Sequence, residues 1–367
     1  MLVSPEDFMT RTHQRFGALL KSAYQRLHSH LPDEAAERLS DLVFSVMGRP
    51  RVYHNSHKHP QQRLRRGAVT FSIDFEMAWA FQYSKVSGPR CVELGLRERQ
   101  QVPKILALFD KYSVPATWAT VGHLCLEQCK RNSIGLAHSE IARCGHFENE
   151  HWKFTTGDWF QNDPCTDAHQ NPAWYAPDLV EAIVSARVSH ELASHTFSHA
   201  GFGSYCPAEV AAAELDNSIE AMRPYGVRPT TLVFPGNDIG WLDVVAAKGF
   251  RIVRAFPHTN AEISLPMKIN NDLWGVHSST IVDGGTGAAN LEKRLFILKT
   301  YVDKAVASNL AAHFWFHPSL TLPRLHGLLF PLVEYCAKLR EQGSIDILTM
   351  EGLVNETESA LLRQGSH

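Results

Sequence analysis

The sequence predicts an α/β fold built on a parallel sheet that is either open or closed into a barrel. From Gly67 onward, short runs rich in β-branched and aromatic residues alternate with segments of helical periodicity. Such alternation favours parallel strands that are joined by crossover helices. With 367 residues, of which 44% are hydrophobic and 20% charged, the chain is long and apolar enough to bury a large core.

The expected elements follow one another in a regular order. The expected strands span residues 68–73, 116–121, 191–194, 231–234, 251–255, 310–316 and 345–348. The expected helices span residues 96–111, 177–186, 207–223, 240–248, 291–307 and 323–342. The stretch 130–174 interrupts this order, because it is rich in aromatic residues, glycine, aspartate and asparagine. A loop of this length in a compact domain is more often functional than idle.

Residues 1–60 are expected to form a separate N-terminal segment, and residues 61–367 the barrel domain. Leu20, Tyr24 and Leu27 recur at helical spacing, and a basic, proline-containing linker follows the helices. We expect these helices to be the contact of a homo-oligomer. The charged N-terminus does not read as a signal peptide, and the 7 cysteines include no CxxC pair. Both features favour a cytoplasmic location.

Charge and hydropathy exclude two classes of partner. Lys and Arg number 36 and Asp and Glu number 38, so the net charge of −2 supplies no basic field for a nucleic acid. No apolar run is long enough to cross a bilayer. The unusual feature is the content of 20 histidines, because histidine is the commonest metal ligand in proteins.

Two pairs of side chains at strand ends predict a metal site. His195 and His199 follow the expected strand 191–194, and on one helical turn their rings would face the same way. Asp74 and Glu76 follow the strand 68–73, and on an extended chain both carboxylates project to one side. One carboxylate and two imidazoles make a three-ligand site with an open position, and the other carboxylate would take a proton from water. The residues alone leave open which carboxylate has which role.

Two further strand ends carry candidates for catalysis. His317 ends the strand 310–316, and Pro318 biases it to an extended backbone that aims the ring outward, where it would protonate a leaving amine. His313 on the same strand is expected in the core. After the strand 231–234, the backbone N–H groups near Gly236 and Asn237 are either oxyanion donors or part of a plain capped turn.

The aromatic stretch of about residues 130–174, called the excursion below, supplies candidates for substrate binding. Trp152, Trp159 and Tyr175 either form a rim that stacks on a sugar ring or pack an ordinary long loop. Nearby, His123 and Cys129 suggest a second metal site together with Cys125, although buried residues of this kind more often belong to a core.

Taken together, these motifs resemble the NodB-type polysaccharide deacetylases, carbohydrate esterase family four, over about residues 68–349. The segment 74–76 stands for the family's aspartate motif, and His195-Thr-Phe-Ser-His199 matches its H-[ST]-x-x-H metal motif. Residues 234–237 stand at its arginine/proline motif, His317 at its terminal histidine motif, and residues 115–122 resemble its second strand.

The resemblance implies a distorted (β/α) barrel and metal-dependent removal of an N-acyl group, usually N-acetyl, from an amino sugar in a small-molecule or oligosaccharide substrate. It assigns Asp74 as the base and Glu76, His195 and His199 as ligands of one divalent ion, most simply Zn²⁺. It assigns His317 as the acid.

The sequence departs from the family pattern at two places. Asp-Phe-Glu replaces two adjacent aspartates, and Gly236 stands near the place of the arginine that commonly orients the base. Arg228 and Arg254 are the candidates to replace that arginine. The alternatives are a hydrolase of the same fold that cleaves a formamide or a cyclic amide, and a catalytically silent relative that binds glycan.

Overall fold

The computed structural model describes residues 53–54, 63–255, 262–283 and 288–364. The expected N-terminal segment, residues 1–60, lies outside the described residues apart from β1 (Tyr53–His54). This short strand pairs in parallel with β9 (Glu262–Ile263). The domain boundary and the expected oligomer contact therefore remain predictions.

A 10-stranded sheet forms the centre of the described chain, in the order β10-β11-β8-β7-β6-β3-β2-β13-β12, with β14 also paired to β2. Its strands are β2 (Gly67–Phe75), β3 (Thr117–Thr120), β6 (Glu191–Ser194), β7 (Thr231–Val233), β8 (Ile252–Ala255), β10 (Met267–Lys268), β11 (Trp274–His277), β12 (Thr280–Ile281), β13 (Ala311–Phe316) and β14 (Ile345–Leu348). All neighbours run parallel except β10 and β11. The sheet curls, which confirms the expected distorted (β/α) barrel.

The central strand β2 shows how the sequence places polar groups inside the barrel. Val69, Phe71, Ile73 and Phe75 belong to the main hydrophobic core. Because side chains alternate along a strand, the residues between them face the opposite side of the sheet. That side carries small and polar residues and ends at Asp74.

The helices follow the strands in the expected order. They are α3 (Ala78–Phe81), α4 (Cys91–Tyr112), α5 (Pro177–Val184), α6 (Ala208–Met222), α7 (Leu242–Ala247), α8 (Ala288–Ser308), α9 (Leu322–Arg324), α10 (Phe330–Glu341) and α11 (Met350–Gln364). The expected helix 323–342 is divided by a π turn at Leu325–Leu329, directly before Pro331, whose nitrogen cannot donate a backbone hydrogen bond. Within the described residues, no helix combines the length and the apolar character that crossing a membrane requires.

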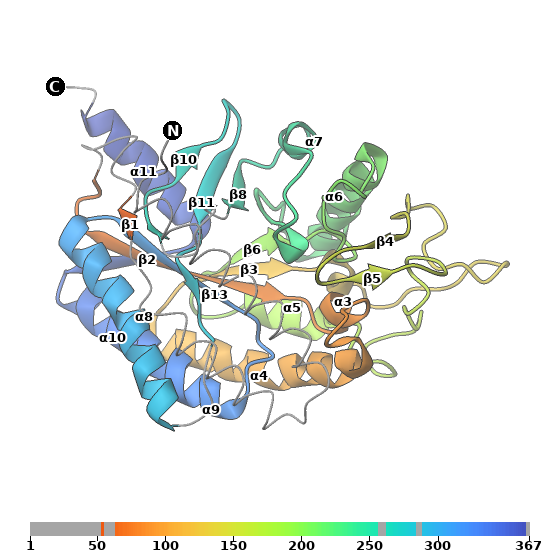
Figure 1. The fold of residues 1–367 in the computed structure, drawn as a ribbon, viewed down its shortest axis with the longest axis horizontal. Coiled ribbons are helices and arrows are strands. Elements are labelled where there is room, and N and C mark those ends of the chain that lie inside the picture. The colour runs from red at the N-terminus through yellow and green to blue at the C-terminus, as the bar shows by residue number, and fades with distance from the viewer. Residues whose placement is uncertain (1–52, 55–62, 256–261, 284–287, 365–367) are drawn as a thin grey trace, which may run out of the picture.

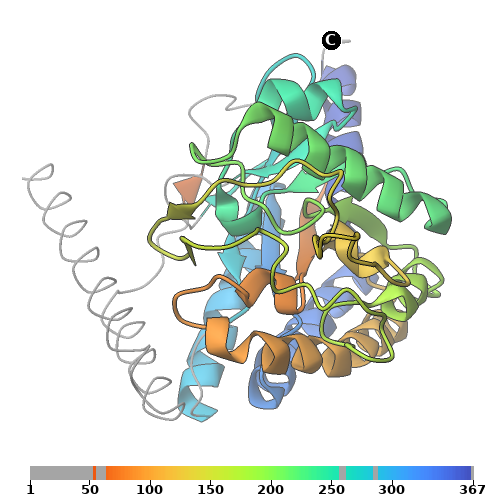
Figure 2. The same ribbon diagram turned by 90° about the vertical axis from the view of Figure 1, so that its right-hand side faces the viewer.

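The excursion between β3 and α5 contains little regular structure. Its strands are the short antiparallel pair β4 (Phe147–Glu148) and β5 (Lys153–Phe154). In Figure 1 the arrowheads of β2, β3 and β6 point toward this excursion. Figure 2 views the molecule from that end and shows the excursion crossing in front of the sheet. It therefore lies over the edge at which functional side chains of parallel sheets gather.

Candidate metal centre

Three side chains from distant parts of the sequence meet at the carboxyl edge of the sheet. Glu76 Oε1 lies 2.7 Å from His195 Nε2 and 3.3 Å from His199 Nε2. All three residues are buried, and their potential ligand atoms lie within 4.8 Å of one another. We call Glu76, His195 and His199 the edge site.

The two histidines of the edge site meet through a turn rather than on a helix face. Thr196 and His199 adopt left-handed backbone conformations, with φ of 59° and 62°. The turn is held by Glu214 of α6, whose Oε2 accepts the N–H groups of Phe197 and Ser198, each at 2.8 Å. The sequence placed both histidines correctly, where the strand β6 ends and a turn begins.

The ring orientations fit a bound cation. His195 Nδ1 lies 2.7 Å from the carbonyl oxygen of Val233, so this nitrogen donates and Nε2 of a neutral ring carries a lone pair. That lone pair faces the Glu76 carboxylate, a contact that is favourable only with a shared proton or a cation between the two. Burial lowers the pKa of His199, which keeps its ring in the neutral form that binds metal ions.

A second buried carboxylate holds the chain at Glu76. Glu98 of α4 accepts the backbone N–H of Glu76 at 3.2 Å and that of Met77 at 2.8 Å. Burial and the nearby Glu76 raise the pKa of Glu98 well above its usual value. Burial also acts to raise the pKa of Glu76. The imidazoles of His317, His199 and His195 have the opposite and larger effect, so the pKa of Glu76 lies well below its usual value.

Asp74, at the end of β2, pairs with a buried arginine. Arg254 of β8 donates through Nη1 to Asp74 Oδ1, and through Nη2 to Oδ2 at 2.6 Å. Nη1 also donates to Ser72 Oγ at 3.1 Å, and the guanidinium lies 5.0 Å from the ring centroid of Trp315. Arg254 therefore contacts the carboxylate as the missing family arginine would. Arg228 instead donates to a backbone carbonyl at the protein surface.

The two histidines of β13 and its end occupy different environments. His317 has a side chain that is 31% exposed, and its Nε2 lies 3.5 Å from Glu76 Oε2. His313 is buried with its Nε2 2.8 Å from Ser72 Oγ, and burial lowers its pKa to about 3. His313 lies in the interior of the fold, as the sequence predicts.

A cavity of about 620 Å³ opens over the edge site. Its lining contains the carboxylates of Asp74 and Glu76 and the imidazoles of His199 and His317. Several residues of the excursion and of the connection between β2 and α4 complete it. The lining residues are Asp74, Glu76, Ala80, Phe81, Ser84, Lys85, Val86, Ser87, Glu150, His151, Trp152, His199, Gly236, Asn237, Trp315 and His317. Of the expected substrate-binding residues, Trp152, Gly236 and Asn237 line this cavity.

The turn after β7 has no room for an arginine. Gly236 has a φ of +59°, and a Cβ atom there would lie 2.1 Å from the indole of Trp152. The N–H of Asn237 donates to the carbonyl of Phe234 at 3.0 Å. Of the two amides expected as oxyanion donors, only that of Gly236 therefore stays a candidate.

Two expected substrate contacts are wrong. Tyr175 is fully buried, and Trp159 is 4% exposed with its indole N–H donating to Ser198 Oγ at 2.7 Å. Neither residue lines the cavity over the edge site. Their rings pack inside the excursion and have no free face for a sugar.

Glu98 and Glu214 are the supporting residues that the sequence analysis missed. Each falls among the buried positions of its helix, next to apolar residues. A glutamate on the apolar face of an amphipathic helix indicates a buried acid that binds partner groups, because an acid is rarely buried without partners.

Comparisons with known proteins agree with this architecture. The sequence profile of the family described as Polysaccharide deacetylase matches residues 88–248. This match supports membership of the NodB-type polysaccharide deacetylase superfamily. The same match supports a hydrolase. A search of curated proteins finds no match.

Solved structures with this fold share little sequence with the chain. A structure from Mycobacterium smegmatis described as a polysaccharide deacetylase is 15% identical, with a TM-score of 0.53, over 86% of this chain and 95% of that one. A structure from Pseudomonas aeruginosa PAO1 with the same description is 14% identical, with a TM-score of 0.53, over 79% and 90%. The PuuE allantoinase is 13% identical, with a TM-score of 0.54, over 85% and 98%. At these identities the likeness shows the fold alone.

Proposed function

We propose that this polysaccharide deacetylase relative is a metal-dependent hydrolase that removes an N-acyl group, N-acetyl in the first instance, from an amino sugar or a sugar-containing precursor. The observation that carries the proposal is the edge site at the floor of a cavity that Asp74 and His317 also line. The alternative is cleavage of another C–N bond, in a formamide or a cyclic amide. The named activity of the allantoinase neighbour gives that alternative a reason to be tested.

Glu76, His195 and His199 are the proposed ligands of one divalent ion. Two imidazole nitrogens and one carboxylate oxygen, with an open position toward the cavity, are the donor set of a catalytic Zn²⁺ site. When bound, the ion supplies a lowered pKa of water and polarisation of the acyl carbonyl.

Asp74 is the proposed general base. Its carboxylate lines the cavity, and one of its oxygens lies within 4.8 Å of a Glu76 oxygen and of a His317 nitrogen. The bidentate pair with Arg254 fixes the orientation of this carboxylate. Asp74 is therefore ready to take the proton of a water molecule that attacks the acyl carbon.

His317 is the proposed general acid. Its side chain is 31% exposed and lines the cavity, so a leaving nitrogen can approach it. Proton transfer to that nitrogen is needed because an amide does not readily expel an unprotonated amine. Gly236 lines the same cavity, and its N–H is the proposed donor to the developing oxyanion.

The wall of the cavity suits a carbohydrate, the substrate class that the family implies. Trp152 and Trp315 offer aromatic faces, while Lys85 and Glu150 offer charged groups for hydroxyl contacts. Aromatic faces combined with a few polar groups are typical of sites that bind small polar ligands.

A panel of acyl donors tests the proposed function. The wild-type protein, loaded with Zn²⁺, is incubated with N-acetylated amino sugars, chito-oligosaccharides, a formamide and cyclic amides, and release of acid or amine is measured. We expect hydrolysis of an N-acetylated sugar. Exclusive hydrolysis of a formamide or cyclic amide would establish the alternative. Binding of glycan with no hydrolysis by fully loaded protein would mean that the chain is catalytically silent.

A further inference from the structure

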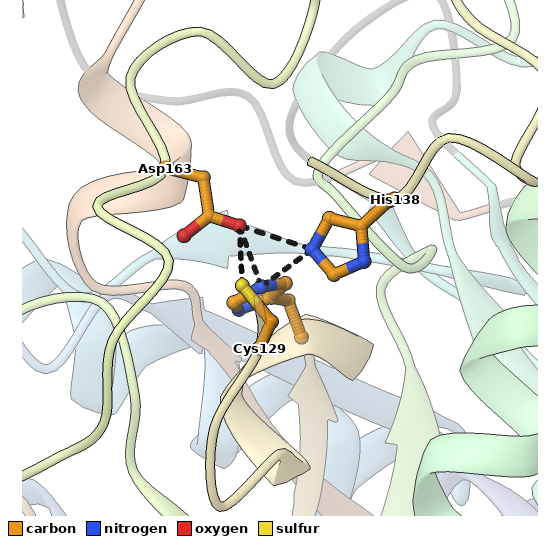
Figure 3. A group of neighbouring side chains, drawn as sticks. Cys129, His138 and Asp163 are labelled. Carbon is orange, nitrogen blue, oxygen red and sulfur yellow. Dashed lines mark hydrogen bonds and ion pairs between the residues drawn. The ribbon is translucent and has the colours of Figure 1, made fainter. Parts of the chain in front are cut away.

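A second group of metal-binding side chains lies within the excursion, away from the cavity. His123 lies in the 3₁₀ turn Gly122–Cys125 after β3, Cys129 follows that turn, and His138 and Asp163 come from two later segments. Their potential ligand atoms all lie within 4.8 Å of one another. Figure 3 shows Cys129, His138 and Asp163 pointing toward one another from separate parts of the chain.

We propose that His123, Cys129, His138 and Asp163, which we call the loop site, bind a second divalent ion, Zn²⁺, that holds the excursion in place. None of these residues belongs to the edge site or lines the cavity above it. Cys125, which the sequence grouped with them, is buried but lies outside the cluster.

The contacts on one oxygen atom are difficult to explain by hydrogen bonds alone. Asp163 Oδ2 lies 3.0 Å from His123 Nε2, 3.0 Å from His138 Nε2 and 3.3 Å from Cys129 Sγ. The two Nε2 atoms are themselves 3.1 Å apart. If these contacts were all hydrogen bonds, the two imidazole N–H groups and the thiol would donate to the same oxygen of Asp163, and the two N–H groups would lie side by side. An oxygen offers only two lone pairs. One cation among the four atoms would satisfy all of them.

The distances and charges of the loop site also suit Zn²⁺. Ligand nitrogen and oxygen atoms about 2.0–2.1 Å from one tetrahedral ion lie about 3.3 Å from each other, and a thiolate sulfur slightly farther. The observed spacings of 3.0–3.3 Å are close to those values. Two neutral imidazoles, one thiolate and one carboxylate neutralise a divalent ion, so the occupied site carries no net charge into the interior.

The second oxygen of Asp163 is held in the manner of a metal ligand. Oδ1 accepts the Tyr175 hydroxyl at 2.8 Å and the backbone N–H of Cys165 at 2.9 Å. Such outer contacts orient a ligating carboxylate and leave its other oxygen directed at the ion. This explains why Tyr175, expected at the substrate, is buried.

The loop site has the features of a structural metal site. His123 and Asp163 have fully buried side chains, and that of His138 is 8% exposed. The site joins the start, middle and end of an excursion whose strands are only the short pair β4 and β5. The excursion carries Trp152 to the catalytic cavity, and the backbone N–H of His123 donates to Phe197, between the edge-site histidines, at 2.8 Å. An ion in the loop site would therefore fix two walls of the active site.

Metal analysis of the whole protein tests this inference. Protein expressed with added Zn²⁺ is passed through gel filtration, and its zinc content is measured for the wild type, Cys129→Ser and His195→Ala/His199→Ala. We expect about two ions per wild-type chain and about one in each variant. We also expect the first unfolding transition of Cys129→Ser to fall by roughly 5 °C or more. One ion in the wild type that disappears in His195→Ala/His199→Ala would overturn the loop site.

Cobalt spectroscopy identifies the ligand without relying on activity. A Co²⁺ ion bound by a thiolate shows a sulfur-to-metal charge-transfer band in the near ultraviolet, and the edge site contains no cysteine. We expect this band in the wild type, in His195→Ala/His199→Ala and in the control Cys125→Ser, and its loss in Cys129→Ser and His138→Gln. Absence of the band from cobalt-loaded wild-type protein, or its persistence in Cys129→Ser, would overturn the assignment. The proposed hydrolase can fail its own test while this band remains, so the two proposals are separable.

Discussion

The edge site and the loop site use similar side chains in opposite surroundings. The edge site offers three donors beneath a cavity of about 620 Å³. The loop site offers four donors within the excursion, of which three are buried and Cys129 is partly buried. Catalytic zinc sites keep a position open for water or substrate, whereas structural sites fill all four positions with protein ligands. The difference in access and donor number indicates which cluster acts on a substrate.

The two sites also differ in what holds them. The edge site is supported by Glu98 and Glu214 from helices that pack against the sheet, and its neighbour Asp74 is fixed by Arg254. The loop site lies in a segment with little regular structure. We therefore expect the edge site to be largely formed before an ion binds, and the loop site to depend on its ion for order.

Loss of the edge-site imidazoles should have the largest effect on activity. In His195→Ala/His199→Ala we expect hydrolysis of the true substrate to fall by a factor on the order of 10⁴ or more, because the ion and its polarisation of the carbonyl are lost. Initial rates measure the effect, with the exposed His169→Ala as a control for histidine loss. Near wild-type rates in the double variant would show that chemistry occurs elsewhere.

Removal of the base should abolish turnover without removing the ion. For Asp74→Asn we expect kcat to fall about 10²–10⁴-fold, while the zinc content stays that of the wild type. The matched control is Asp346→Asn, a half-exposed acid on β14, which pairs with the opposite end of β2. Loss of zinc from Asp74→Asn would instead assign Asp74 as a ligand and leave the base role to Glu76.

The buried pair of Asp74 and Arg254 should appear in stability as well as in catalysis. Arg254→Met leaves the carboxylate buried without its partner, and we expect the free energy of unfolding to fall by about 3–5 kcal/mol. Denaturant unfolding of Arg254→Met, Asp74→Asn and the double variant forms a cycle. The free energy of unfolding should fall by less in the double variant than the sum of the decreases in the two single variants. Strict additivity would mean that the pair is not coupled.

His313 should make the sheet interior sensitive to acid. Burial lowers its pKa to about 3 from the ordinary 6.5 that it regains on unfolding. Between these values the unfolded chain binds a proton that the folded chain does not, so stability decreases as the pH falls through this window, by up to about 1.4 kcal/mol per pH unit. Urea unfolding measured from about pH 4 to 7 gives the free energy of unfolding as a function of pH. This free energy should change less steeply with pH in His313→Gln than in the wild type or in the exposed His169→Gln. Equal slopes in all three proteins would contradict a buried neutral His313.

The contact between Gly236 and Trp152 should give the smallest effect. Gly236→Ala places a methyl group against the indole at a position with φ of +59°, so we expect a loss of about 1–3 kcal/mol and a displaced ring. If the ring stacks on the substrate, KM should rise more than kcat falls. An unchanged KM would remove Trp152 from the proposed substrate contacts.

Much of the barrel could be predicted from the sequence. The strands β6 and β14 have the bounds expected from their apolar runs, and the bounds of β2, β3, β7, β8 and β13 differ from the expected ones by at most two residues at each end. The strands β10, β11 and β12 were missed. β10 and β12 have two residues each, too few to show a period, whereas β11 is as long as some of the predicted strands. The helix α11 was also missed, because many of its residues are polar.

The metal-ligand candidates could be found because they stand at strand ends, where the architecture brings residues together regardless of separation. Arg254 was one of two candidate arginines, and only the pairing of β7 with β8 and the barrel curvature place it opposite Asp74. The loop site was harder to predict. Asp163 and His138 lie in an irregular segment, so no periodicity indicates that they meet His123.

Anomalous diffraction from a crystal soaked with Zn²⁺ tests the central claim most directly. We predict a peak at the edge site about 2.0–2.2 Å from a carboxylate oxygen of Glu76 and from Nε2 of both His195 and His199, with its open side toward the cavity. A fully soaked crystal with no peak between these three side chains, or with zinc bound only elsewhere, would contradict the account of this chain as a metal-dependent hydrolase.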